Sequence, residues 1–322
     1  MGKFNVITFG SAVVDAFVDV AVMEDKEKIC FPLGSKILIE NVNFSIGGGG
    51  TNTAVSFSKL GLKTGFVGKI GKGHNSGIIL QELEKDGVKF LGARGKEHTG
   101  YSVVLGGKGG ERTILVYKGA NNNLKFNELD LRKLKSDWFY FSSMMGESFL
   151  TQKKLVNYAK KNGIKVAFNP STYQVEKGLG ELKEILENTD VFILNKQEAA
   201  YIVRSGDIKR IHGLGPKIVC ITDGKNGNVA SDGIYRYNAQ AHKDIKCVER
   251  TGAGDAFASG FVSGLIKNKG IEEAIQMGSA NAESTIQTPG AKNGLLTYNE
   301  MLKIIKRNTV KIIKEKYENN IF

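Results

Sequence analysis

The sequence of 322 residues is poor in cysteine, proline and arginine, and it has no long apolar run. Three cysteines, an odd number without a CxxC pair, argue against a disulfide framework and against a structural zinc site. The chain has eight arginines and 37 lysines, so its net charge of +12 comes mainly from lysine. Most sequence-specific nucleic-acid-binding proteins rely on arginine instead. No segment approaches the ~20 apolar residues that span a bilayer, and no secretory signal precedes the first strand pattern. We therefore expect a cytoplasmic protein that binds neither membranes nor nucleic acid.

The remaining composition is that of a folded α/β protein. Hydrophobic residues make up 41% of the chain and charged residues 24%, close to globular averages. No low-complexity linker divides the chain, so we predict a single domain over residues 1–322. Short β-branched and aromatic runs alternate with helical stretches, which is typical of a parallel sheet covered by helices. The predicted strands cover residues 5–10, 64–68, 138–142, 165–169, 191–195 and 218–222.

Two segments, residues 13–46 and 99–119, interrupt this pattern. In both, apolar and polar residues alternate around glycine turns, which predicts antiparallel hairpins outside the main sheet. We expect the two segments to form a small β lid. Further predictions toward the C-terminus are strands over 227–231 and 234–238, a strand-like segment at Ile245 and Cys247, and a mostly helical tail from Tyr298.

The sharpest local motif is Thr251-Gly252-Ala253-Gly254-Asp255, which precedes an amphipathic helix. Small residues let a ligand approach the backbone, and the N–H groups and dipole at a helix N-terminus favour an anion. Asp255 is therefore either a helix cap or a general base that takes a proton from an alcohol. In the second case the amides of Gly252, Ala253 and Gly254 would stabilise charge on a transferring phosphoryl group.

A second motif runs from Gly47 to Gly50 and continues through Thr51 and Asn52 into a helix. It is not a Walker A loop, because no Lys-Ser or Lys-Thr pair follows, and it lacks the Gly-x-Gly-x-x-Gly order of a dinucleotide-binding turn. The first strand also ends without such a glycine triplet, which disfavours an NAD-dependent oxidoreductase. The motif is either a tight turn before a helix capped by Thr51 or Asn52, or a place where a polar ligand lies against bare backbone.

Together the two motifs resemble the signature motifs of the ribokinase-like (PfkB) family of carbohydrate and nucleoside kinases. The resemblance continues, in order and spacing, over nearly the whole chain. It includes an Asp after the first strand, an Asn-x-x-Glu tetrad, a Thr-Asp-Gly turn, a late Asn and a Pro-Gly-Ala sequence. These are Asp15, Asn195 to Glu198, Thr222 to Gly224, Asn281 and Pro289 to Ala291. The resemblance implies a three-layer α/β/α sandwich with a mostly parallel central sheet and a small β-sheet lid.

The resemblance also implies roles for these residues in phosphoryl transfer from ATP. Asp255 would be the general base, and the amides of Gly252, Ala253 and Gly254 would form the anion hole. Asn195 and Glu198 would organise Mg²⁺ near the phosphates, whereas in isolation they would be a helix start and an exposed acid. The nucleotide would be bound by Asn195, Thr222, Gly224 and Asn281. The acceptor would be bound by Asp15, Gly48, Asn52, Glu147 and Asp255, of which Glu147 could equally be a helix N-terminal acid.

Some positions depart from the family pattern. Ribokinase itself usually has Asn where Val13 stands and Lys where Gly49 stands, which argues against ribose as the acceptor. Glu249 replaces an Asp that helps to bind an activating monovalent cation, so activation by K⁺ is in doubt. Arg112 could meet a charged group of the substrate or cap a hairpin, and Arg250 could reach a phosphate or lie at the surface.

We therefore expect an ATP-dependent kinase that phosphorylates a hydroxyl of a sugar or sugar-like compound. A nucleoside kinase, a phosphosugar kinase and a non-catalytic sugar- or nucleotide-binding homologue are the alternatives. We expect the lid to close over the acceptor, and a homodimer through the lid is a further hypothesis. The four histidines are too scattered for a metal site, and Cys247 is interpreted as a buried small hydrophobe.

Overall fold

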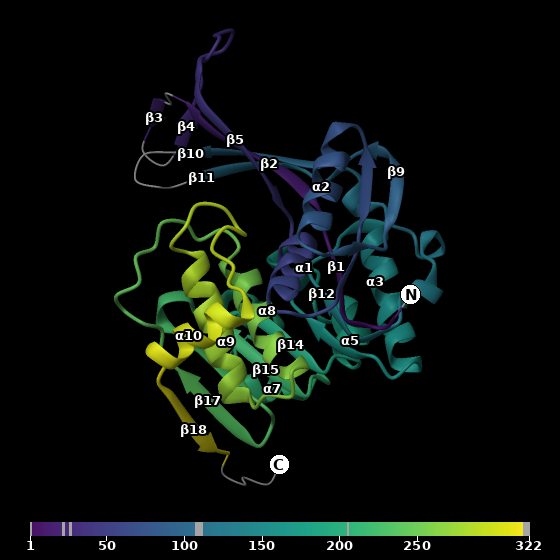
Figure 1. Cartoon of the computed structure of the whole chain (residues 1–322), viewed down its shortest axis with the longest axis vertical. Coiled ribbons are helices and arrows are strands. Elements are labelled where there is room, and N and C mark those ends of the chain that lie inside the picture. Colours follow the sequence, from purple (N-terminus) through teal and green to yellow (C-terminus); the bar gives the residue numbers. More distant parts are fainter. Residues whose placement is uncertain (1, 21–22, 26–27, 107–111, 205, 318–322) are drawn as a thin grey trace.

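One large sheet is the central feature of the computed structural model (Figure 1). The structure describes residues 2–20, 23–25, 28–106, 112–204 and 206–317. The parallel strands of the sheet are β1 (Phe4–Phe9), β6 (Thr64–Val67), β8 (Lys89–Phe90), β12 (Ser136–Phe141), β13 (Lys165–Phe168), β14 (Val191–Asn195) and β15 (Ile218–Thr222). An antiparallel extension adds β16 (Asn228–Ser231), β17 (Tyr235–Ala239) and β18 (Ile312–Lys316). The ten strands lie in the order β18-β17-β16-β15-β14-β13-β12-β1-β6-β8. All six predicted parallel strands occur, and the predicted α/β class with a mostly parallel sheet is confirmed.

Helices cover both faces of this sheet because its strands are apolar on both sides. One face packs against α3 (Gly146–Lys161), α4 (Thr172–Val175), α5 (Leu179–Leu186), α6 (Lys196–Ile202) and α7 (Ile208–His212). The other packs against α1 (Gly49–Lys59), α8 (Ala253–Ile266) and α9 (Ile271–Thr285). Helix α10 (Tyr298–Arg307) lies on α9, and α2 (His74–Lys85) lies near the lid. In the part of the chain that the structure describes, no helix has the length and apolar character of a membrane span.

The two segments with the hairpin pattern join in a second, four-stranded sheet of order β11-β10-β2-β5. Its strands are β2 (Val13–Val20), β5 (Ile39–Gly47), β10 (Gly100–Gly106) and β11 (Arg112–Tyr117). β2 pairs with β10 in parallel, and each pairs with its own hairpin partner in antiparallel fashion. This sheet, called the lid below, projects from one end of the molecule, at the top of Figure 1. Two small ribbons complete the strands: β3 (Met23–Asp25) with β4 (Lys28–Cys30), and β7 (Lys69–Lys72) with β9 (Ala93–His98).

Three predictions near the C-terminus are wrong. The segment around Ile245 and Cys247 forms turns instead of a strand, because charged neighbours on both sides of Ile245 leave little apolar surface to bury. Cys247 is exposed and not a buried hydrophobe. The tail is helical only over α10, after which Ile312–Lys316 forms β18 and pairs with β17 at the edge of the large sheet.

Candidate active site

The two glycine-rich motifs meet at the carboxyl group of Asp255. Helix α8 starts after Gly252, which has the left-handed φ of 81°, and its first helical hydrogen bond runs from the Ala256 N–H to the Gly252 carbonyl at 2.8 Å. Asp255 therefore lies in the first turn. Its Oδ2 accepts a hydrogen bond of 2.9 Å from Asn52 Nδ2, on the first turn of α1 and 203 positions away in sequence. The contact brings the N-termini of two helices to one carboxylate.

The surroundings of Asp255 suit a proton acceptor. Burial raises the pKa of its carboxyl group, and the hydrogen bond from Asn52 opposes that rise. Beneath it, burial and the charge of Asp255 together raise the pKa of the Tyr140 hydroxyl well above its ordinary value, so Tyr140 stays neutral. A carboxylate whose proton affinity is raised above the ordinary value is the kind of group that can act as a general base.

Glycines let the backbone of α1 approach this carboxylate. Gly48 precedes the helix with φ 98°, and the helix starts at Gly49, so neither Thr51 nor Asn52 caps it as predicted. A Cβ atom added to Gly49 would lie 3.1 Å from Ser142 and 3.5 Å from Asp255 Oδ1. Asn52 is only 6% exposed, and its Oδ1 has no hydrogen-bond partner among the described residues. The motif thus places beside Asp255 an oxygen atom that has no partner among the described residues.

The three amides of the predicted anion hole differ in their hydrogen bonds. The Ala253 N–H donates to the Arg250 carbonyl at 3.2 Å and closes the turn before α8. The N–H of Gly254, at an exposed position in the first turn, has no acceptor within the helix. Arg250 is exposed, as in the surface alternative. Among the described residues the Ala253 N–H is thus used in the turn before α8, whereas neither the Gly252 nor the Gly254 N–H donates to a backbone carbonyl.

On the lid side, Asp15 lies on β2, opposite Ser102 of β10 and Ser45 of β5. Burial raises the pKa of Asp15, whereas a hydrogen bond with Ser102 and the charge of Lys292 lower it. A side chain on Gly47 would overlap the Asp15 carboxylate, so this glycine makes room for the acid. The predicted acceptor residue Glu147 is partly buried in the first turn of α3. That turn lies against η2 (Gly119–Asn122), the 3-10 turn that follows the lid strand β11.

The predicted metal and nucleotide residues gather at the ends of β14 and β15. Asn195 and Glu198 form a reciprocal helix cap, with the Glu198 N–H on Asn195 Oδ1 and the Asn195 N–H on Glu198 Oε2, both at 2.9 Å. Glu198 is 6% exposed, and burial raises the pKa of its carboxyl group. Thr222 lies directly opposite Asn195 in the sheet register. Gly224, with φ 51°, opens the turn that follows Thr222.

Asn281 does not join this group. It is fully buried in α9, and its Nδ2 donates to Ser56 Oγ at 3.0 Å and to the Ala256 carbonyl at 2.8 Å. Its Oδ1 accepts the Leu296 N–H at 3.1 Å. These bonds tie α1, α8 and the segment after α9 together. The side chain is occupied with packing and is not presented to a nucleotide.

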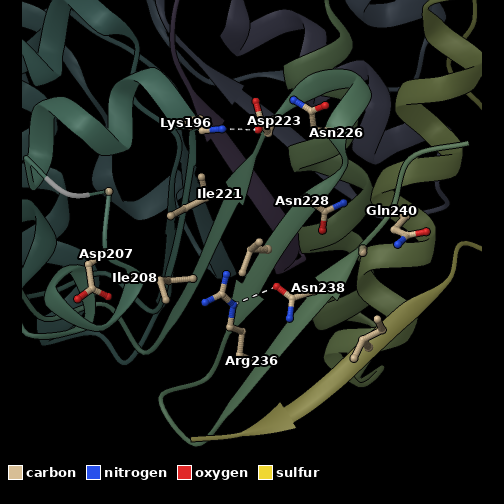
Figure 2. Close-up of a pocket in the computed structure, with 14 residues that line it drawn as sticks. Lys196, Asp207, Ile208, Ile221, Asp223, Asn226, Asn228, Arg236, Asn238 and Gln240 are labelled. Atoms are coloured by element: carbon tan, nitrogen blue, oxygen red, sulfur yellow. Dashed lines mark hydrogen bonds and ion pairs between the residues drawn. The ribbon is translucent and has the colours of Figure 1, made fainter. Parts of the chain in front are cut away.

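A groove of about 520 Å³ lies beside the turn at Asp223, and Figure 2 shows its polar lining. Lys196 pairs with Asp223 at 2.8 Å, and Arg236 Nε donates to Asn238 Oδ1 at 3.0 Å. The groove follows the sheet face that carries Ile221, opposite the face covered by α8. It therefore adjoins the predicted nucleotide turn but is separate from Asp255.

Sequence reasoning missed Lys292, a buried cation whose charge acts on Asp15. Its side chain is 9% exposed and its Nζ pairs with Glu82 Oε1 of α2 at 2.7 Å. The only signal was its place directly after the Pro-Gly-Ala sequence. The side chain of Arg112 lies outside the described residues. Within those residues no group of three or more histidine, cysteine or acidic side chains could hold a metal ion.

Known proteins are similar to this chain over most of their length. The family profile described as pfkB family carbohydrate kinase matches residues 5–297. An uncharacterised sugar kinase of Archaeoglobus fulgidus is 31% identical over 252 residues, 75% of this chain and 98% of that protein. A cytidine kinase of Thermococcus kodakarensis is 28% identical over 274 residues, 82% of this chain and 94% of that one.

Among solved structures, an Arabidopsis thaliana ribokinase in complex with ribose and ATP aligns with a TM-score of 0.82 at 22% identity. The alignment covers 95% of this chain and 99% of the ribokinase, which supports the same fold. The named relatives are kinases of sugars and nucleosides, which supports a kinase of a carbohydrate or nucleoside acceptor. With a family profile that spans nearly the whole chain and a relative above 30% identity, the chain belongs to the pfkB family of carbohydrate kinases.

Proposed function

We propose that this protein transfers the γ-phosphoryl group of ATP to a hydroxyl of a sugar or sugar-like acceptor, with Asp255 as the general base. The observation that carries the proposal is the 2.9 Å hydrogen bond between Asn52 and Asp255. It joins two glycine-rich helix starts at one carboxylate, where a hydroxyl can lose its proton close to two positive helix ends. The family and the sugar kinase relative support the same chemistry.

The chain's own residues account for each part of the step. The unsatisfied Oδ1 of Asn52 accepts a hydrogen bond from an acceptor hydroxyl, and Asp15 accepts another from the lid side. The reacting hydroxyl gives its proton to Asp255 as its oxygen forms a bond to the γ-phosphorus. The bond from that phosphorus to the β–γ bridging oxygen breaks, and ADP leaves. The amides of Gly252 and Gly254 stabilise the charge of the transferring group.

Mg²⁺ is expected with ATP, and the residues present fit it. Asn195, Glu198 and Thr222 offer amide, carboxylate and hydroxyl oxygens at two neighbouring strand ends, which is the ligand type that Mg²⁺ prefers. Bound there, mostly through water and phosphate oxygens, the ion would neutralise phosphate charge. The nucleotide would lie along the turn from Thr222 to Gly224, and we assign Asn281 no direct contact with it.

A monovalent cation does not fit in the same way. Glu249 is 4% exposed, and its carboxylate accepts the Gly290 N–H at 2.8 Å. The Glu249 side chain, longer than that of the Asp it replaces, thus bonds directly to the backbone of the turn after α9. We propose that the enzyme needs no K⁺, because a hydrogen bond within the chain holds this turn.

A nucleoside acceptor is the second candidate, and one observation favours it. The cytidine kinase of Thermococcus kodakarensis matches 82% of this chain at 28% identity, so one scaffold of this kind serves a nucleoside in a relative. The phosphosugar alternative depends on the excess of lysine and on Arg112, whose side chain is not described. The non-catalytic alternative is weakened because Asp255, Asn52 and Gly252 stand together at one site.

We also propose that a second copy of the chain covers one face of the lid. Phe44 of β5 and Leu115 of β11 lie on that face, in a cross-strand row that also contains Val103 of β10 and the buried Ala16 of β2. Phe44 is 61% exposed and Leu115 is 57% exposed, and apolar patches of this kind mark interaction sites. Sedimentation equilibrium should show a dimer that Phe44→Glu converts to a monomer. A wild-type monomer at high concentration would rule the pairing out.

The test of the proposed activity is release of ADP from MgATP over a panel of acceptors. The panel contains pentoses, hexoses, keto-deoxy acids, phosphosugars and nucleosides, and Asp255→Asn serves as the blank. Turnover with one acceptor class that vanishes in the variant would support the kinase and identify its substrate class. ATP binding without turnover on any acceptor would favour the non-catalytic homologue.

A further inference from the structure

Lys292 is a buried cation that none of the assigned roles uses. Of the lysines that the structure describes, only Lys69 and Lys292 are buried, at 6% and 8% exposure. Lys69 pairs with Glu128 at 2.8 Å, and Lys292 pairs with Glu82 at 2.7 Å. Removing an ammonium group from water costs free energy unless charges and hydrogen bonds compensate it. A buried lysine whose charge acts on Asp15 of the predicted acceptor site therefore needs an explanation.

The position of Lys292 couples it to the anion hole. Its neighbour Ala291 lies directly against Gly252, since a Cβ atom added to Gly252 would be 2.7 Å from both Cα and the carbonyl oxygen of Ala291. The backbones of the turn after α9 and of the start of α8 are thus in van der Waals contact. A shift of that turn moves the amides that face the phosphoryl group.

Two side chains connect this turn to other segments. Glu249, just before α8, accepts the Gly290 N–H at 2.8 Å. Lys292 pairs with Glu82 of α2, a helix that contacts the lid strands β2 and β5. The charge of Lys292 also acts on Asp15 of the lid and on Asp86 at the end of α2. One ammonium group therefore faces the turn, the helix under the lid and the acceptor-side carboxylate.

We propose that Lys292 is a positioning residue that holds the turn of residues 288–294 against Gly252 through its ion pair with Glu82. In this way the anion hole is fixed relative to the lid. The inference rests on the proposed function, because it assigns Gly252 and Gly254 to the γ-phosphoryl group. It goes beyond that function by assigning a role to a lysine to which the proposed transfer step gives none.

The test compares the affinities of ADP and of the β,γ-imido analogue of ATP, both with Mg²⁺, by titration calorimetry. Only the analogue has a γ-phosphoryl group at the anion hole, so the ratio of the two dissociation constants reports on the hole and needs no acceptor. In Lys292→Met the ratio should shift against the analogue by about 10-fold or more, the effect of one hydrogen bond to a charged group. ADP affinity should stay the same, and Lys292→Arg should restore most of the ratio.

Controls separate positioning from stability. Lys69→Met removes the other buried lysine and should lower the unfolding midpoint without moving the ratio. If Lys292→Met does not fold, Glu82→Gln removes the same ion pair and should shift the ratio in the same direction. An unchanged ratio in the folded variants, with a wild type that binds both nucleotides, would overturn the inference. A wild type that binds neither nucleotide would overturn the proposed function, and this inference with it.

Discussion

Replacement of Asp255 by Asn should remove the base and leave the site in place. The two side chains have the same shape, and the amide oxygen introduced by Asp255→Asn can still accept the hydrogen bond from Asn52 Nδ2. What disappears is the ability to take a proton. General base catalysis contributes roughly 10²–10⁴ in rate, which corresponds to about 3–5 kcal/mol on the barrier. We expect kcat to fall by that factor while the dissociation constant of ADP stays unchanged.

The raised pKa of Asp255 also predicts the direction of two further effects, one on stability and one on the pH dependence of kcat. Burial makes the pKa higher in the folded protein than in the unfolded chain, so the ionised carboxylate destabilises the fold at neutral pH. Asp255→Asn should therefore raise the unfolding midpoint. Since only the ionised form accepts a proton, wild-type kcat should fall in acid at a pH above the ordinary aspartate range, and the variant should lack this fall.

The assay couples ADP release to NADH oxidation across pH 4.5–8, a range chosen as roughly that in which carboxyl and imidazole groups titrate, and thermal unfolding is followed by circular dichroism. Asp244→Asn, at an exposed position, is the matched control for loss of one acidic charge. Full turnover in Asp255→Asn would refute the assignment of the base. Loss of turnover together with a lowered unfolding midpoint would refute the argument from burial.

Three further predictions concern the parts around the base. Gly252→Ala should lower both stability and kcat, because a left-handed φ of 81° costs an alanine about 1–2 kcal/mol and the added methyl group meets the neighbouring turn. Gly180→Ala, in open space on α5, is the control that should lower neither. Glu198→Gln keeps the helix cap but removes a carboxylate. The Mg²⁺ concentration for half-maximal activity should therefore rise about 10-fold or more, with little change in the unfolding midpoint. An unchanged Mg²⁺ titration would remove Glu198 from the metal site. Activity at constant ionic strength should be equal in KCl, NaCl and tetramethylammonium chloride, because the carboxylate of Glu249 holds the turn after α9, and a several-fold preference for KCl would contradict this.

The main sheet could be predicted because its signal is local. Each parallel strand is a short run of β-branched and aromatic residues, and burial on both faces makes such runs continuous in the sequence. The meeting of Asn52 with Asp255 could be expected only through the family resemblance, since 203 positions separate the two residues. The segment at Ile245 was mistaken for a strand because its alternation of apolar and charged residues also fits an exposed turn.

Other features depend on contacts that no local pattern encodes. Asn281 has the polarity of a ligand-binding residue, but its three hydrogen bonds lead to Ser56, Ala256 and Leu296 in other segments. Lys292 has the appearance of one more surface lysine in a chain with 37 of them. Its burial is decided by Glu82, whose place on α2 beside the turn follows from the packing of the whole domain.

The division of the acceptor site between lid and body has a consequence for fidelity. Asp15 is carried by the lid sheet, whereas Asp255 starts a helix of the main body. Under the proposed function, a molecule that hydrogen-bonds to only one of the two carboxylates does not connect the lid to the body and therefore does not stabilise the closed lid. Water is such a molecule, so hydrolysis of ATP without an acceptor should be slow for a geometric reason. Selectivity against wasteful turnover would then reside in the hinge between two sheets, well away from the reacting atoms.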